Sequence, residues 1–107
     1  MELGTKEVAA AMTLDKLRQN SRTEILRLAR EHGALNVRVF GSIARGTATE
    51  SSDLDLLVDF SPERSLLDQI ALQQDLEQLL GCHVDLLEPG GVSPHLAKAI
   101  LSEAIPL

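Results

Sequence analysis

The sequence is poor in cysteine, aromatic residues and long apolar runs. A single cysteine excludes a disulfide within the chain. Because there is no tryptophan or tyrosine and only two phenylalanines, the core must be built mainly from aliphatic side chains. No segment approaches the roughly 18 apolar residues of a membrane helix, and the first residues lack the apolar run of a signal peptide. We therefore expect a cytoplasmic protein without a membrane segment, and 107 residues predict one domain.

Positive charge is also scarce. The chain carries 10 Lys and Arg against 16 Asp and Glu, a net charge of −6. This balance makes a nucleic-acid partner unlikely, because affinity for phosphodiester backbones comes largely from basic side chains. Residues 1–45 carry +3, whereas residues 46–107 carry −9. Ordinary solvated helix faces would explain the division, and so would a basic half that meets phosphates or an acidic partner.

Helix and strand patterns alternate along residues 13–107, and residues 1–12 show no clear pattern. We expect a flexible N-terminal arm at 1–12 and a single domain at 13–107. Strands are predicted at 36–40, 53–60 and 82–87, and helices at 13–19, 21–33, 65–80 and from 93 onward, with a short helical turn at 42–46. The order α-β-α-β-α-β-α predicts an α/β (α+β) domain in which helices cover a three-stranded mixed sheet.

Local signals set the expected ends of these helices. Ser21 with Glu24 reads as a capping box, and Ser65 is the expected cap of the third helix. Gly33 and Gly81 are the expected stops. The apolar side of the third helix is predicted to consist of Leu66, Ile70, Leu76, Leu79 and Leu80. The apolar tail 104–107 is predicted to meet a protein partner, the alternative being that it folds back onto the sheet.

The most informative stretch runs from Phe40 to Asp59. Gly41 and Ser42 end one predicted strand, and Asp53 and Asp55 lie two apart on the next. Side chains two apart on a strand share a face, so these carboxylates should repel one another unless a cation lies between them. Mg²⁺ suits such a pair, because it binds one or two carboxylates together with substrate phosphates. Glycine lets the backbone approach a phosphate, and a helix starting there offers unpaired N–H groups. The combination predicts nucleotidyl transfer.

Each half of this pattern is weak when taken alone. Gly-Ser turns are common, and many Asp-x-Asp pairs are exposed strand ends. A calcium loop is excluded because Leu57 occupies its third ligand position. On the same face as the pair, Asp59 lies roughly 13 Å from Asp55 by strand rise and is expected to be solvated. The spacing between the two halves is therefore what carries the interpretation.

The pattern resembles the DNA polymerase β-like nucleotidyltransferase superfamily, and within it the minimal nucleotidyltransferases encoded beside HEPN-domain proteins. The matching segments are G-S-I-A-R-G at 41–46 and S-D-L-D-L at 52–56, with Asp85 as the third carboxylate on a later strand. One departure is Ile43, where many relatives carry a basic residue. The resemblance implies a single minimal nucleotidyltransferase domain whose catalytic and metal-binding residues, expected to hold two Mg²⁺ ions, are Asp53, Asp55 and Asp85.

The same resemblance implies that the nucleotide is bound by Gly41, Ser42, Arg45, Gly46 and Ser52. Arg45 could instead pair with an acidic residue of its own domain, and Ser52 could cap the loop before the strand. His83 shares the strand parity of Asp85 and could border the site, although exposure to solvent is the simpler expectation. Cys82 should be a buried small hydrophobe.

The implied activity is transfer of AMP from ATP to a protein. Members of this branch are typically antitoxins of HEPN toxins, and some adenylylate a tyrosine of the toxin. Two other functions stay open: an idle antitoxin that binds and occludes its toxin, and an enzyme that modifies a small molecule, as aminoglycoside nucleotidyltransferases do. A homo- or hetero-oligomer is compatible with the partner that this resemblance implies.

Overall fold

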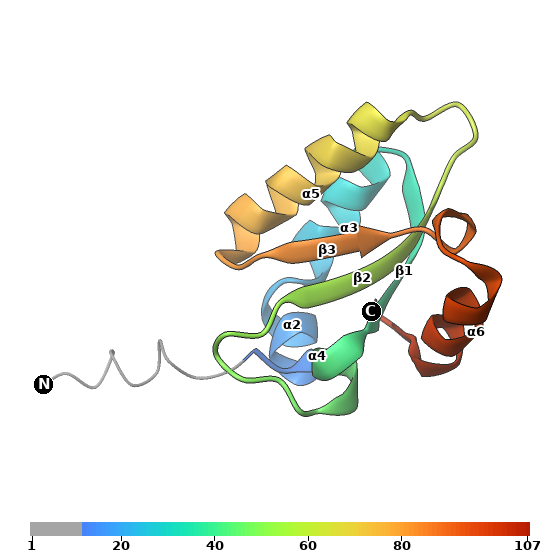
Figure 1. Cartoon of the computed structure of the whole chain (residues 1–107). Coiled ribbons are helices and arrows are strands. Elements are labelled where there is room, and N and C mark those ends of the chain that lie inside the picture. The colour runs from blue at the N-terminus through green and yellow to red at the C-terminus, as the bar shows by residue number, and fades with distance from the viewer. Residues whose placement is uncertain (1–11) are drawn as a thin grey trace, which may run out of the picture.

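The computed structural model describes residues 12–107 and places a four-stranded mixed sheet among helices (Figure 1). The first eleven residues, which make up most of the expected arm, lie outside the described part; Met12 packs against the core. The strands are β1 (Ala34–Phe40), β2 (Leu54–Phe60), β3 (Val84–Leu87) and β4 (Ile105–Pro106). The helices are α2 (Leu14–Asn20), α3 (Arg22–Glu31), α4 (Gly41–Arg45), α5 (Leu66–Leu80) and α6 (Pro94–Glu103), with a 3₁₀ turn η1 (Pro89–Gly91).

The strand order is β3-β2-β1-β4. β2 is antiparallel to β1 and parallel to β3, so the predicted three-stranded mixed sheet forms the centre. The prediction missed β4, which pairs antiparallel with β1. The N–H of Leu107 also donates to the carbonyl of Val37 at 3.0 Å, and the Leu107 side chain is buried. The expectation that this tail is a partner surface is therefore wrong, because β1 needs a neighbour on its free edge and the tail supplies one.

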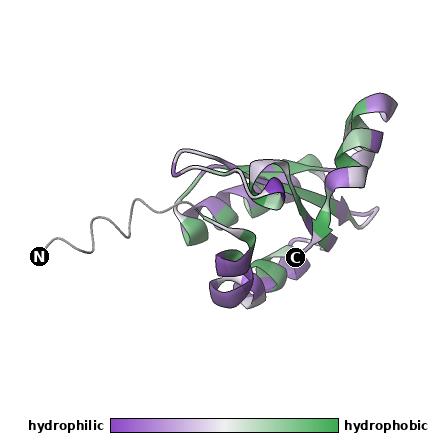
Figure 2. Cartoon of the chain, turned by 90° about the horizontal axis from the view of Figure 1, so that it is seen from below, coloured by the Kyte–Doolittle hydropathy of each residue, from purple (hydrophilic) through white to green (hydrophobic). Residues whose placement is uncertain are grey.

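One face of the sheet carries the main core. Leu54, Leu56 and Val58 alternate onto this face and are buried, as the strand pattern predicts. Helices α3 and α5 pack over it. In Figure 2 the strands are mostly hydrophobic, whereas the helices carry hydrophilic and hydrophobic stripes. Leu57, on the opposite face, is also buried, as is Ile100 of α6, but neither belongs to the main core cluster. The second face of the sheet is therefore partly covered, and the carboxylates lie at the end of this face.

Helix α5 begins as predicted, with a full capping box from Ser65 and Asp68. Its predicted apolar side is confirmed in part: Leu76 is buried and Leu80 packs against the core. The prediction was wrong for three residues, since Leu66 is 68% exposed and Ile70 and Leu79 are each 40% exposed, and it missed the buried Leu72. Leucines surround this helix, so its periodicity does not single out one face.

The capping box expected at Ser21 does not form. The N–H of Ser21 bonds to the carbonyl of Leu17 and so ends α2, and the Ser21 side chain makes no capping bond to α3. Glu24 pairs instead with Arg27 at 3.0 Å. A residue that both ends one helix and begins the next has no backbone freedom to adopt the extended capping conformation. Within residues 12–107, no helix combines the length and the apolar character that crossing a membrane requires.

Candidate active site

The end of β1 and the starts of β2 and β3 meet at one edge of the sheet. In the register of the strands, Phe40 lies opposite Asp55, and Asp55 lies opposite Asp85. The sheet thus brings Gly41, Asp55 and Asp85 together from segments far apart in the sequence. Asp59 lies at the other end of β2, where it contacts Arg38 and Asn36. The two-residue periodicity therefore grouped Asp53 and Asp55 as the sheet does. Asp59 has the same periodicity but lies apart from them.

Gly41 packs directly against Asp55. Its φ is +78°, a conformation that favours glycine, and a Cβ placed there would clash with Asp55 Oδ2. Burial, the charge of Asp85 and a hydrogen bond with Asp85 raise the pKa of Asp55 to about 6, with a smaller contribution from Asp53. The Arg45 charge acts in the opposite direction. Asp55 is thus a crowded carboxylate whose negative form a nearby cation would stabilise.

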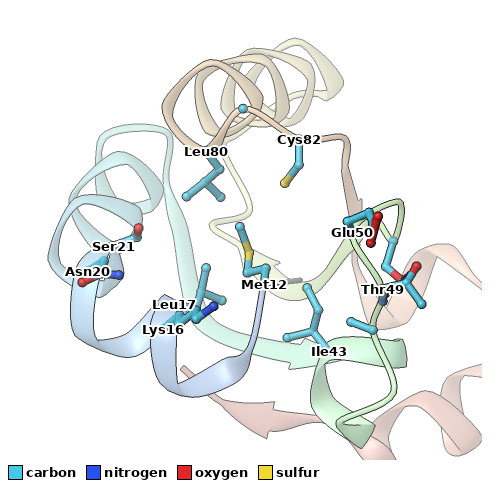
Figure 3. A pocket seen from close by; sticks show the side chains of 13 residues that line it. Met12, Lys16, Leu17, Asn20, Ser21, Ile43, Thr49, Glu50, Leu80 and Cys82 are labelled. Carbon is cyan, nitrogen blue, oxygen red and sulfur yellow. Dashed lines mark hydrogen bonds between the residues drawn. The ribbon is translucent and has the colours of Figure 1, made fainter. Parts of the chain in front are cut away.

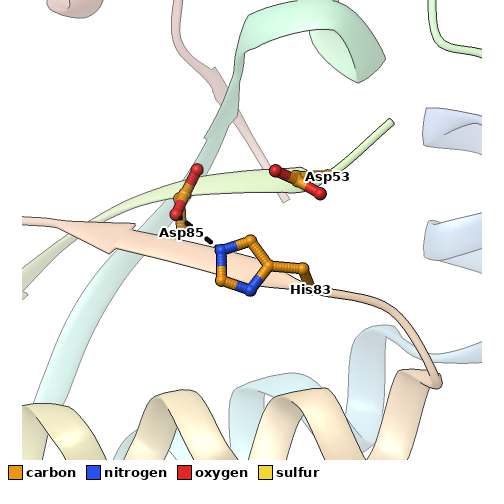
Figure 4. Close-up of side chains that lie close together, drawn as sticks. All are labelled: Asp53, His83 and Asp85. Carbon is orange, nitrogen blue, oxygen red and sulfur yellow. Dashed lines mark hydrogen bonds and ion pairs between the residues drawn. The ribbon is translucent and has the colours of Figure 1, made fainter. Parts of the chain in front are cut away.

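His83 joins the carboxylates at this edge (Figure 4). One potential ligand atom from each of Asp53, His83 and Asp85 lies within 4.8 Å of the others. His83 Nε2 is 3.0 Å from Asp85 Oδ1, and its Nδ1 is 2.7 Å from Glu77 Oε2. Although burial acts to lower the pKa of His83, the hydrogen bond with Asp85 and the charges of Asp53, Asp85 and Glu77 raise it. His83 is solvent-exposed, the simpler of the two sequence-based expectations, and it also borders the site, as the parity that it shares with Asp85 indicated.

The Gly-Ser segment forms α4, a helix of five residues that ends at Gly46 in the left-handed conformation. The N–H of Gly41 donates to Glu103 Oε2 at 2.6 Å, and Arg45 donates to Glu103 Oε1 at 2.8 Å. The sequence predicted unpaired N–H groups at the start of this helix, but the Gly41 N–H has a partner. Arg45 pairs with an acidic residue of its own domain, which was one of its two alternatives. Among the described residues, Glu103 is a site contact that no local pattern in the sequence indicated, since it lies 62 residues after Gly41.

Ser42 and Ser52 differ in their surroundings. The Ser42 hydroxyl makes no hydrogen bond within residues 12–107, and the residue is half-buried. Ser52 Oγ accepts the N–H of Thr49 at 2.8 Å and so caps the loop before β2, as its structural alternative anticipated. Ser42 has a hydroxyl available for a ligand, whereas the Ser52 hydroxyl already has a backbone partner.

Hollows on either side of α4 differ in what they reach. A cavity of about 610 Å³ lies between the strand ends and α6; the residues lining it include Gly41, Arg45, Asp55, Asp85, Leu96 and Glu103. A smaller cavity of about 360 Å³ lies beside α2 and the 48–52 loop, with Ile43 and Leu80 in its wall (Figure 3). Cys82 lines this smaller cavity and is half-buried rather than fully buried, and burial raises the pKa of its thiol. The larger cavity is the one that reaches the carboxylates.

Comparison with known proteins agrees with this geometry. Residues 22–107 match the family model described as a nucleotidyltransferase domain. The chain is 38% identical to the protein adenylyltransferase MntA of Thermococcus cleftensis, over 90% of this chain and 97% of that protein. A solved structure assigned as a minimal nucleotidyltransferase is 52% identical, with a TM-score of 0.80, and the match covers 90% of this chain and 97% of that one.

A mutant of the MntA–HpeT toxin–antitoxin complex contains a chain that is 25% identical, with a TM-score of 0.68, and the match covers 81% of this chain and 71% of that one. The family match spans β1 to β4 and every carboxylate of the site. The chain therefore belongs to the nucleotidyltransferase domain family, and its catalytic class is that of a nucleotidyltransferase.

Proposed function

We propose that this chain is a protein adenylyltransferase, the antitoxin of a HEPN toxin–antitoxin pair, and that it transfers AMP from ATP to a tyrosine of its toxin. One observation carries the proposal: Asp53, Asp55 and Asp85 converge beside Gly41 and Ser42 in a chain of the nucleotidyltransferase family. The adenylyltransferase name of a relative that matches over 90% of this chain supports AMP as the transferred group. Such a protein would act in the cytoplasm, where ATP is present.

The carboxylates fit a divalent cation. Asp53 and Asp85 present oxygens close enough to share an ion, and burial together with the charges of Asp85 and Asp53 raises the pKa of Asp55, which a bound cation would offset. Carboxylate oxygens are the ligands that Mg²⁺ prefers. We infer that Asp53, Asp55 and Asp85 hold Mg²⁺, two ions in the complete site. When bound, such ions supply charge stabilisation for the reacting phosphate.

The neighbouring groups are suited to hold a triphosphate. The Ser42 hydroxyl has no partner among the described residues, and Arg45 uses only Nη1 in its bond to Glu103. We infer that Ser42 and Arg45 bind phosphate oxygens while Gly41 allows their close approach and Gly46 ends α4 beside them. Asp85 is partly exposed, so it can accept the proton of an incoming hydroxyl. Ser52 would support the loop rather than contact the nucleotide.

The acceptor is proposed to be a protein because this small domain offers little surface for binding a separate substrate. Leu96 and Leu101 of α6 are 48% and 45% exposed, and Leu96 also lines the larger cavity. Apolar side chains exposed next to an active site suit a protein that brings its own binding surface. The toxin–antitoxin complex that shares this fold supports a toxin as that protein.

The test is an intact-mass measurement on a HEPN toxin encoded beside this chain. We expect the toxin mass to rise by one or more AMP groups only when wild-type chain, ATP and Mg²⁺ are all present, and peptide mapping to place AMP on tyrosine. The matched control is Asp53→Ala, which should form the complex without the mass change. A toxin that is neutralised with no change in mass would establish antitoxin action by occlusion instead. AMP found on an aminoglycoside without any protein partner would favour a small-molecule acceptor.

A further inference from the structure

Glu103, the last residue of α6, accepts hydrogen bonds from two residues of the Gly-Ser segment. Its Oε2 accepts the Gly41 N–H at 2.6 Å, and its Oε1 accepts a donor of the Arg45 guanidinium at 2.8 Å. The bonds from Arg45 and from Gly41 also lower the pKa of Glu103, so it is ionised at neutral pH. One carboxylate thus ties the first and the last residue of α4 to a helix from the end of the chain.

Helix α4, whose ends Glu103 contacts, has little stability of its own. Helix α4 has five residues, far fewer than an isolated helix needs in water. The Arg45 side chain is 54% exposed, and a long side chain in solvent samples many rotamers. Ile43 of α4 is buried in the main core, so packing sets the orientation of the helix. The direction of the exposed Arg45 side chain has no such support and depends on its partner.

Helix α6, which carries Glu103, is anchored at both ends. Ser93 is the N-cap of helix α6, and Ile100 within the helix is buried. After Glu103 and Ala104 the chain enters β4, which is paired with β1. Glu103 therefore projects from a fixed element toward the exposed side chain of Arg45.

Arg45 lies where its direction matters. It lines the same cavity as Asp55 and Asp85, and its charge acts on Asp55. A guanidinium has five N–H donors, and the bond to Glu103 uses one nitrogen, so others remain for an anion. We propose that Glu103 is a positioning residue, which holds the start of α4 through the Gly41 N–H and fixes the Arg45 guanidinium in the orientation that receives the nucleotide phosphates. This inference rests on the proposed function and assigns a role that acts through Arg45.

The opposite role makes a different prediction. If Glu103 occupied the position of a phosphate, its removal would tighten nucleotide binding, whereas loss of a positioning residue weakens it. The experiment measures Mg–ATP affinity by calorimetry on the full chain for Glu103→Gln, Arg45→Ala and the double variant. Ser102→Ala is the matched control, because Ser102 adjoins Glu103 and, among residues 12–107, its hydroxyl donates only to the Ala99 carbonyl within α6. Circular dichroism melts check that each variant is folded.

We expect Glu103→Gln to raise the Kd roughly two- to tenfold, the cost of ordering one mobile side chain on binding. In the Arg45→Ala background the same change should alter the Kd by less than about twofold, because the residue through which Glu103 acts is gone. Nitrogen relaxation at Arg45 Nε should show greater side-chain mobility in Glu103→Gln than in wild type, and no such increase in Ser102→Ala.

A tighter or an unchanged Kd in Glu103→Gln would overturn the inference, and so would an equal effect in both backgrounds, which would mark a purely structural bond. Wild-type chain that fails to bind Mg–ATP would remove the proposed function as well. Normal binding by wild type with no effect of Glu103→Gln would remove this inference alone.

Discussion

Asp55 and Asp85 lie directly opposite one another on the parallel strands β2 and β3. A parallel register holds the two carboxylates at a fixed separation whether or not a cation is present, so the repulsion between them is part of the metal-free fold. Four of the predictions below follow from this relationship and from the residues around it, and the other concerns β4.

Asp55→Asn should reduce nucleotidyl transfer by more than about a hundredfold, because it removes a ligand of the ion that stabilises charge on the reacting phosphate. The same change should not lower the melting temperature of the metal-free domain, since it removes one of the repelling charges. Transfer is measured by incorporation of labelled AMP, and stability by thermal unfolding in EDTA. Wild-type transfer in this variant would refute the assigned site.

The stability of the metal-free domain should depend on pH through Asp55. Its folded pKa of about 6 is higher than its ordinary value of 3.8, so the folded domain binds this proton more tightly than the unfolded chain does. The contribution of Asp55 is thus full below pH about 4 and is lost as the pH rises through about 6. Urea unfolding in EDTA at pH 4 to 7 should show wild type losing stability relative to Asp55→Asn. Parallel pH profiles for the two proteins would contradict this.

Gly41→Ala and Gly46→Ala form a matched pair. Both glycines have a φ of +78°, so each substitution should cost about 1–2 kcal/mol from the left-handed backbone alone. A Cβ at Gly41 also meets Asp55 Oδ2, whereas a Cβ at Gly46 meets nothing within 4 Å. Gly41→Ala should therefore lose about 1 kcal/mol or more beyond Gly46→Ala in chemical denaturation. Equal losses would show that Asp55 moves aside freely.

Mg²⁺ and ATP together should raise the melting temperature by more than the sum of their separate shifts, because the ion is shared between the carboxylates and the phosphates. Ser42→Ala should weaken the shift caused by the nucleotide and leave the shift caused by Mg²⁺ alone in place. Differential scanning fluorimetry gives all the shifts in one series. Purely additive shifts would argue against a joint site.

Leu107→Ala should destabilise the domain by about 2 kcal/mol, because this side chain is buried behind β4. Leu101→Ala, a leucine that is 45% exposed, should change stability by less than about 0.5 kcal/mol. Equilibrium unfolding in urea compares the two. A greater loss in Leu101→Ala would mean that α6, and not β4, closes the fold.

The sequence predicted those parts of the site that depend on local pattern. Two-residue periodicity placed Asp53 and Asp55 on one face, and the resemblance to the nucleotidyltransferase superfamily pointed to Asp85 on a later strand. It could not predict Glu103 as a partner of Gly41, because that contact joins residues 62 apart and depends on how α6 packs. The buried face of α5 was predicted only in part: Leu76 is buried as expected, but Leu66 and Leu72 are the same residue type, and only tertiary contacts determine which of them is buried.

The pairing of β4 with β1 has a consequence for synthesis on the ribosome. Val37 accepts a hydrogen bond from Leu107, and Gly41 donates one to Glu103, so the sheet and the Gly-Ser segment are completed only after residues 103–107 have been synthesised. Until then β1 presents an unpaired edge, the kind of surface that invites association with other chains. A ribosome stalled before residue 103 would therefore hold a nascent chain with an open sheet edge and no carboxylate to hold Arg45.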